Sequence, residues 1–410
     1  MNRKQFVILL IIVVVLGAAG LLIQRQNQSA LESGKKGAGQ KLLADLPVND
    51  VNSILIKSGT NELNLVKAGK WQVKERNGYP ANFEEIRNLL LKMVDLKAAQ
   101  TEEIGPSHLG RYKLLPPGPA TNTAMLVEFR DQSAKPIRSL LLGKTHNRKS
   151  QGRPSPMGEM GDEGFPDGRY VMVGAGAKTV AVVSDPLSNI EPSPAQWLNK
   201  DFFKVEKVRS ISVTYPVATN SWKLTRETET AEWKLAEAKP GEQLDSSKTS
   251  GLSNPLNSPS FNDVAASAKA QDLGLDKPTV ANLDTFDNFA YTLKIGPKTN
   301  DIIPLMLSVT AQLPKERTPG KDEKPEDKAK LDKAFKDKQQ PLEDKLAQEK
   351  ACENWIYLVS SWTLDPILKE RSQLLAEKKE EPKKDEKKDD KPASTSLAPK
   401  PAEPKPPETK

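Results

Sequence analysis

Cysteine and histidine are almost absent from this chain of 410 residues, which contains one cysteine and two histidines. A single thiol excludes a disulfide framework within the chain, and it also excludes a cysteine-based zinc cage. Cys352 lies close to the hydrophobic segment 355–357, a context typical of a small core residue rather than a nucleophile. His108 and His146 lack the spacing of metal ligands, so we interpret the first as a turn residue and the second as a loop residue.

Catalytic motifs are missing as well. The chain has no Gly-x-Ser-x-Gly elbow of the kind found in hydrolases. The segment Leu140–Thr145 (LLLGKT) ends like a phosphate-binding loop but lacks the glycine that begins one, so this chain is not the ATPase of a transporter. The sequence therefore predicts no catalytic residues, no cofactor-binding residues and no metal ligands, and we interpret the protein as non-enzymatic.

One acidic loop leaves two interpretations open. Glu159, Asp162, Glu163 and Asp167 lie together in a segment rich in glycine and proline. Calcium prefers several oxygen ligands on a flexible loop, but the spacing departs from the Asp-x-Asp-x-Asp-Gly pattern. The loop is either a cation site or a solvated surface loop.

Long hydrophobic runs are absent except for one near the start. Residues 5–23 carry no charge and would span about 28 Å as a helix, roughly one bilayer core. Arg3 and Lys4 favour keeping the preceding end in the cytoplasm. A cleaved signal peptide is the alternative, but this run is longer than the hydrophobic core of most signal peptides. We expect residues 1–24 to anchor the chain once in the cytoplasmic (inner) membrane, with its bulk on the extracytoplasmic or periplasmic side.

The charge is high but nearly balanced. The chain has 61 basic and 54 acidic residues, and its net charge is +7. Such a small excess indicates solubility, and it gives only weak support for an anionic partner such as a lipid headgroup. We expect no nucleic-acid partner. Aromatic residues make up only 5% of the chain, and the tryptophans, which lie mostly in predicted strands, are interpreted as core residues.

Composition divides the remainder of the chain into four parts. Residues 25–47 are rich in Gln, Ser, Gly and Lys and predict a stalk, whereas residues 371–410 are mostly Lys, Glu, Asp and Pro and predict a disordered tail. The two parts between them, 48–203 and 204–370, predict two domains related by an imperfect internal duplication.

The duplication rests on matched strands about 160 residues apart, a period too long for a solenoid. Val51–Ser58 is matched by Val208–Tyr215, and each alternates apolar and polar residues as a half-buried strand does. A second strand with an inward tryptophan follows in each copy. The inward tryptophans are Trp71 and Trp233. The Leu-Gly elements match at Leu109–Tyr112 and Leu273–Leu275, the hairpins at 124–144 and 280–298, and the strand-end glycines at Gly143 and Gly296. The closing strands match at 169–174 and 354–360, and the tryptophan-headed segments at Trp197 and Trp362.

A helix is predicted after the second strand of each copy. In the first copy Asn82 can cap it, and Phe83, Ile86, Leu89, Leu90 and Met93 have helical spacing. In the second copy Ser258–Ala270 takes that place. Two insertions, Asn147–Gly168 and Pro314–Lys350, are predicted to interrupt the same hairpin position in each copy. We interpret the second, at 314–350, as two short charged helices that dock weakly.

The sequence thus predicts an α+β fold: an N-terminal transmembrane helix, two tandem, internally duplicated α+β domains with mainly antiparallel sheets, and a disordered C-terminal tail. This order of elements resembles the domain-of-unknown-function family 4340. The resemblance covers roughly residues 1–370 and is carried by the anchor, the GKWQVKE strand, the FEEIRNLLLKMVDL helix, LGRYKL, SLLLGK, RYVMVG and QWLNKDFF. The Tyr-Gly-Leu element common in that family is matched only imperfectly here.

The resemblance implies a membrane-anchored extracytoplasmic protein that works beside an ABC-2-type permease of gliding-type export systems, without a known reaction. The first hypothesis is therefore an auxiliary or binding component of an export apparatus. The second is a cell-envelope scaffold that contacts the wall or a lipid surface through its basic stalk and tail. An enzyme that uses the acidic loop is a third. The sequence identifies neither the ligand nor the oligomeric state.

Overall fold

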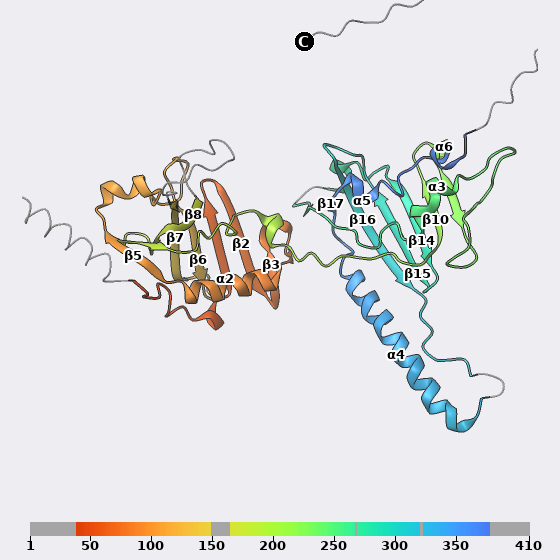
Figure 1. Cartoon of the computed structure of the whole chain (residues 1–410), viewed down its shortest axis with the longest axis horizontal. Helices are drawn as coiled ribbons and strands as arrows, with labels where there is room; N and C mark the ends of the chain where they lie inside the picture. The colour runs from red at the N-terminus through yellow and green to blue at the C-terminus, as the bar shows by residue number, and fades with distance from the viewer. Residues whose placement is uncertain (1–37, 149–164, 267–268, 320–322, 378–410) are drawn as a thin grey trace, which may run out of the picture. The chain divides into compact units, whose positions relative to one another are not determined.

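The computed structural model describes residues 38–148, 165–266, 269–319 and 323–377 (Figure 1). The predicted anchor at residues 1–24 lies outside the described residues. Within the described part of the chain, no helix combines the length and apolar character needed to cross a membrane. The chain divides after Leu375 into two units, and the second, Ala376–Lys410, lies almost wholly outside the described residues.

The first sheet has nine antiparallel strands in the order β4-β3-β2-β1-β6-β7-β8-β9-β5. Alternating apolar residues place one side of each central strand in the core, as Ile54 and Ile56 of β1 show by their full burial. Its strands are β1 Ser53–Ser58, β2 Asn61–Ala68, β3 Lys70–Val73, β4 Tyr79–Pro80, β5 Ala98–Glu103, β6 Met125–Arg130, β7 Pro136–Arg148, β8 Phe165–Val173 and β9 Thr179–Val183.

The second sheet has eight antiparallel strands in the order β12-β11-β10-β14-β15-β16-β17-β13. The predicted α+β class with mainly antiparallel sheets is confirmed. The strands are β10 Val208–Thr214, β11 Trp222–Thr225, β12 Lys234–Leu235, β13 Asp263–Val264, β14 Thr279–Thr285, β15 Phe289–Ile295, β16 Ile302–Ala311 and β17 Tyr357–Ser360.

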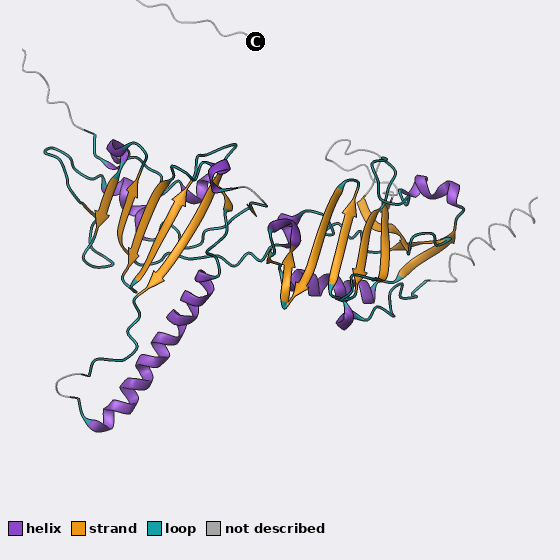
Figure 2. Ribbon diagram, turned by 180° about the vertical axis from the view of Figure 1, so that it is seen from behind, coloured by secondary structure: helices purple, strands orange, loops and turns teal. Residues whose placement is uncertain are grey.

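Few helices accompany the sheets. The α-helices are α2 Phe83–Asp95, α3 Ser246–Thr249, α4 Pro325–Lys350, α5 Ser361–Leu364 and α6 Arg371–Leu374. The 3₁₀ helices are η1 Val48–Asp50, η2 Lys74–Arg76, η3 Pro106–Tyr112, η4 Pro194–Trp197, η5 Ala218–Asn220, η6 Ser250–Ser253 and η7 Ala270–Leu273. α2 lies along one face of the first sheet (Figure 2) and buries Ile86, Leu89, Leu90 and Met93 of its predicted apolar positions, whereas Phe83 is 56% exposed.

The two sheets repeat one pattern of strand order and register, in agreement with the predicted duplication. Ile54 of β1 pairs with Leu65 of β2, and Ile211 of β10 pairs with Leu224 of β11 in the same way. Counting from these pairs across β6–β7 and β14–β15 aligns Gly143 with Gly296, as predicted from the sequence.

The paired tryptophans are equivalent in register but not in burial. Trp71 lies opposite Lys67, and the register of β11 with β12 places Trp233 opposite Arg226. Trp71 is only 8% exposed, whereas Trp233 is partly buried beneath the Arg226 guanidinium, 4.8 Å from the ring centre. Trp71 is thus the stronger core residue of the two.

The helix predicted at Ser258–Ala270 is wrong. That segment is a loop that contains the two-residue strand β13 and ends at the start of η7. Pro259 and the turn-forming Asn262 interrupt its apolar spacing. The counterpart of α2 is instead α3 with η6. Asp245 caps α3 by accepting a hydrogen bond from the Ser247 N–H, just as Asn82 caps α2.

The Leu-Gly elements are equivalent, but with a shifted alignment. Lys113 follows the end of η3 and Gly274 follows the end of η7, and both residues have left-handed backbone conformation with φ of 54° and 70°. The matching triplets are therefore 112–114 and 273–275, and a lysine occupies the position that glycine fills more easily. Both copies need glycine at the strand end because a side chain would clash with the backbone there. A Cβ on Gly143 would lie 2.4 Å from the Tyr112 carbonyl oxygen, and a Cβ on Gly296 would lie 2.8 Å from the Leu273 carbonyl oxygen.

The two insertions do not interrupt the same hairpin. Asn147–Gly168 joins β7 to β8, whereas residues 314–350 lie between β16 and β17, the equivalents of β8 and β9. The predicted match of 169–174 with 354–360 is wrong for the same reason. The sequence pattern predicts no strand at β16 because Pro304 lies inside it, and proline disfavours the interior of a strand.

The long insertion forms one helix rather than the two short ones predicted. α4 runs through Pro341 without a break. A proline inside a helix removes one backbone hydrogen bond, but the residue four positions earlier, Asp337, is exposed, so water can bind its freed carbonyl group.

Both ends of the described chain are more ordered than predicted. In the predicted stalk, Leu43 is fully buried, and the Leu42 N–H donates to the Leu96 carbonyl. In the predicted tail, residues 371–374 form α6, and Leu375 pairs with Leu244. The tryptophan-headed segments are not equivalent: Trp197 is buried, whereas Trp362 is 63% exposed.

The first unit, which ends at Leu375, contains both sheets. Aromatic contacts join residues of the two predicted domains. The Tyr79 ring in β4 lies 4.9 Å from that of Trp355 and 6.1 Å from that of Tyr357, measured between ring centroids. The domain boundaries at 48–203 and 204–370 stay predictions.

Candidate functional site

The α4 helix is the most prominent feature that the fold itself does not require. Its 26 residues would span about 39 Å at 1.5 Å per residue. The loop after β16 leads away from the second sheet and α4 runs back to it, so that the N-terminal half of the helix extends beyond the ends of the strands (Figures 1 and 2). Pro325 lies at its start, where a proline is tolerated because the first helical N–H groups have no partner within the helix.

The C-terminal part of α4 is anchored to the second sheet. Leu342 and Leu346 pack against the hydrophobic core. Glu349 is 4% exposed, and its carboxylate accepts a hydrogen bond of 2.9 Å from the Lys204 N–H. The Tyr291 hydroxyl donates to the other carboxylate oxygen at 2.8 Å. A buried carboxylate with two hydrogen-bond donors fixes the base of the helix against β15 and the segment before β10.

The base of α4 also borders a cavity of about 400 Å³. Burial raises the pKa of Glu349, while Lys345, with its Nζ 3.8 Å from a Glu349 oxygen, opposes that rise. Burial likewise raises the pKa of the Cys352 thiol to about 11, so this group stays protonated near neutral pH. The interpretation of Cys352 as an inert core residue agrees with its burial at 7% exposure.

Glu349 is expected to control how firmly α4 is anchored. Replacing it with alanine leaves the Lys204 N–H without its acceptor and the Tyr291 hydroxyl without one of its two acceptors, and the expected loss in unfolding free energy is about 1–3 kcal/mol. Glu349→Gln keeps an acceptor for the Lys204 N–H and should lose less. Urea unfolding followed by circular dichroism measures both, with the exposed Glu343→Gln as the control; equal losses for the alanine variant and the control would contradict this role.

The Glu349 carboxylate also makes the unfolding free energy depend on pH in a known direction. Because burial raises the pKa of Glu349 above its ordinary value of 4.5, the folded protein binds this proton more tightly than the unfolded chain. Its contribution to stability is fully present below 4.5 and falls as the pH rises through the folded pKa. Relative to Glu349→Gln, the wild type should therefore lose unfolding free energy over that window.

The outer half of α4 is held only to the loop that leads to it. Arg317 forms ion pairs with Glu323 and with Asp332, the second at 3.0 Å. Hydrogen bonds to Glu323 raise the Arg317 pKa, so the guanidinium stays charged. Most of the remaining surface is charged, although Leu331 is 42% exposed, and the exposed ionisable residues are Asp327, Lys328, Lys330, Lys333, Lys336, Asp337 and Lys338.

A helix with polar residues all round is stable mainly when it bridges to another domain or partner, or when many i,i+4 pairs support it. Among the described side chains of α4, the only i,i+4 pairs are Lys345 with Glu349 and Gln340 with Asp344, and both belong to the anchored half or its border. The described side chains of the outer half therefore supply no i,i+4 contact that supports the helix.

Of the four acidic residues weighed as ligands from the sequence, only Asp167 lies in the described part of the chain. Glu159, Asp162 and Glu163 lie outside the described residues. The Asp167 carboxylate lies 2.7 Å from the Nδ1 atom of His146, a contact that sequence spacing did not indicate, and His146 lies in β7 rather than in the predicted loop. Searching the described residues finds no group of three or more His, Cys, Asp or Glu side chains that could hold a metal ion.

His108 and the tryptophans fit structural roles. His108 is exposed in η3, consistent with a turn residue. Trp71, Trp197 and Trp222 are buried, whereas Trp362 is exposed.

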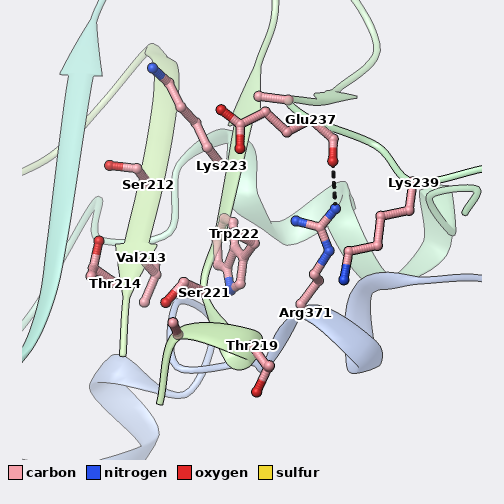
Figure 3. A pocket seen from close by; sticks show the side chains of 12 residues that line it. Ser212, Val213, Thr214, Thr219, Ser221, Trp222, Lys223, Glu237, Lys239 and Arg371 are labelled. Atoms are coloured by element: carbon pink, nitrogen blue, oxygen red, sulfur yellow. Dashed lines mark hydrogen bonds between the residues drawn. The ribbon is translucent and has the colours of Figure 1, made fainter. Parts of the chain in front are cut away.

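A polar cavity of about 340 Å³ lies beside β10 and β11 of the second sheet (Figure 3). Arg371 of α6 closes one side: its guanidinium donates to the Glu237 carbonyl at 2.9 Å and to the Glu242 carboxylate at 2.7 Å. This bond lowers the pKa of Glu242 to about 2. No sequence motif indicates this cavity, because its residues are ordinary polar and strand residues and only the fold brings Arg371 beside the segment 212–239. The lining residues are Ser212, Val213, Thr214, Ala218, Thr219, Ser221, Trp222, Lys223, Ala236, Glu237, Lys239 and Arg371.

Comparison with known proteins supports the family resemblance. The family model described as "Domain of unknown function (DUF4340)" matches residues 159–278, which run from the end of the first insertion to the start of β14. A search of curated proteins and a search of solved structures both found no match.

Proposed function

We propose that this chain is a non-enzymatic, membrane-anchored protein whose sheets lie on the extracytoplasmic side, where α4 binds a protein component of an ABC-2-type export apparatus. The single observation that carries the proposal is the outer half of α4. It is long and rich in charged residues, it is anchored to the sheet at one end only, and its described side chains form no i,i+4 ion pair that would support such a helix alone.

Anchoring at the base suits a docking role. The packing of Leu342 and Leu346 and the buried Glu349 hold the helix direction, so the outer half is presented with little loss of conformational entropy on binding. Its mixed lysine and aspartate side chains would give specificity through charge complementarity.

The membrane and export parts of the proposal rest on sequence features. The uncharged run at residues 5–23 supports the anchor. The match to family 4340 over residues 159–278 supports the resemblance from which the export assignment comes.

Affinity isolation from a detergent extract tests the proposal. The full chain, tagged at its C-terminus and isolated from its native host, should bring down a polytopic ABC-2-type permease in a stable ratio. An isolate that repeatedly contains the chain without any permease, although the permease is present in the extract, would refute the export assignment.

A further inference from the structure

The two sheets differ at one corner, which is the end of β2 and β3 in the first sheet and the equivalent end of β11 and β12 in the second. A carboxylate of the chain occupies this corner in the first sheet only. In the first sheet, both carboxylate oxygens of Glu75 accept hydrogen bonds from the Asn64 backbone N–H, at 2.9 and 3.0 Å. The Asn64 side-chain amide donates to the same carboxylate at 2.9 Å. A carboxylate of the chain itself therefore closes the end of β2 and β3.

The second sheet leaves this corner open. The shared register places Lys223 at the position of Asn64 and Glu237 at the position of Glu75. Glu75 lies in the helical turn η2, but Glu237 has left-handed backbone conformation with a φ of 55°, which directs its side chain differently. The Glu237 carboxylate forms no hydrogen bond with any described residue, and the place that a carboxylate fills in the first sheet becomes part of the 340 Å³ cavity.

The cavity offers cationic and hydroxyl groups to a ligand. Among the described residues, the ammonium groups of Lys223 and Lys239 take part in no hydrogen bond or ion pair (Figure 3). Arg371 is paired with Glu242, and the Glu237 carboxylate also lines the cavity, so Lys223 and Lys239 together with Glu237 leave a net positive charge there. The Ser221 hydroxyl accepts from the Tyr215 N–H at 2.9 Å, which leaves its own proton free to donate.

Further hydroxyl groups surround these lysines. Ser212, Thr214 and Thr219 line the same cavity. A volume of about 340 Å³ lies at the small end of the range for small-molecule sites and suits one or two sugar rings. Several hydroxyl side chains beside a cationic group match a ligand that carries both hydroxyls and a carboxylate.

We propose that this cavity binds an acidic saccharide, whose carboxylate takes the place that Glu75 fills in the first sheet and lies against Lys223. The sugar hydroxyls pair with Ser221 and the neighbouring threonines. The site belongs to the second sheet and does not involve α4, so the proposal stands apart from the function proposed for that helix.

Titration of the full chain in detergent with digalacturonic acid tests the proposal, with fluorescence of the cavity residue Trp222 and calorimetry as readouts. Saturable binding is expected, and Lys223→Ala should weaken it about tenfold, as the loss of one charge-assisted hydrogen bond does. Lys294→Ala, which removes an exposed lysine from β15 of the same sheet, should leave the affinity unchanged.

Three comparison ligands separate the possible sources of binding. Neutral lactose should bind far more weakly than the acidic disaccharide. An amidated peptide and the same peptide with a free C-terminal carboxylate should both fail to compete. Equal binding of lactose, competition by the free carboxylate alone, absence of saturation, or equal effects of the two lysine variants would each overturn the assignment.

Discussion

Removing residues 315–338 and joining Pro314 to Gln339 with a short Gly-Ser turn is expected to abolish co-isolation with the export partner while the sheets stay folded. The truncation keeps Leu342, Leu346 and Glu349, which anchor the helix. The unfolding free energy should change by no more than about 0.5 kcal/mol, as for other surface changes. Affinity isolation and urea unfolding measure the two effects.

A charge-reversed variant serves where the truncation fails to fold. Lys328→Glu, Lys333→Glu and Lys336→Glu keep the helix length but invert its surface charge, and they should weaken co-isolation as strongly. Lys294→Glu on β15 is the matched control, because it changes a lysine away from α4. Unaltered co-isolation of either α4 variant would show that the helix is an insertion without a partner.

Trp71→Ala is expected to cost more stability than the same change at Trp233 or Trp362. Its side chain is 8% exposed in the core of the first sheet, so truncation removes buried surface and leaves a cavity, at a cost of about 3–5 kcal/mol. Trp233→Ala, at the equivalent position, should cost only about 1–2 kcal/mol because the ring is partly exposed and loses mainly its contact with Arg226. Urea unfolding followed by circular dichroism measures both.

Trp362→Ala provides the control for the tryptophan series. This ring is 63% exposed in α5, so its loss should change the unfolding free energy by no more than about 0.5 kcal/mol. Equal losses for Trp71 and Trp362 would contradict the packing described for the first sheet.

Local patterns were sufficient to predict the strands that alternate most regularly. Ile54 and Ile211 lie where the alternation placed them, and the register agrees with the predicted match of the first strands. Asn82 caps α2 as expected, because its side chain and the apolar spacing after it act within one turn of helix.

The errors share a different physical origin. Pro304 argues against a strand at β16 because proline lacks a backbone N–H. Its carbonyl group still accepts a hydrogen bond from the Gly296 N–H at 2.8 Å. Missing that strand shifted every later match and placed the two insertions at the same hairpin. α3, the true counterpart of α2, is only four residues long, too short for a periodic signal.

The candidate sites could not be predicted because they depend on tertiary contacts. Glu349 is one of many charged residues in its segment, and only the fold places it against Tyr291 and the Lys204 backbone. The open corner at Lys223 depends on the left-handed conformation of Glu237, a residue type that rarely adopts it.

Surface labelling of a cysteine at position 60 in intact spheroplasts tests the central claim most directly. Thr60 is exposed in the turn between β1 and β2, and the native Cys352 is buried and serves as an internal negative control. If the chain is anchored by residues 5–23 with its sheets outside the cytoplasm, a membrane-impermeant maleimide should label Thr60→Cys before lysis as fully as after it. Labelling that requires lysis would place the sheets in the cytoplasm and contradict the proposed role beside an export permease.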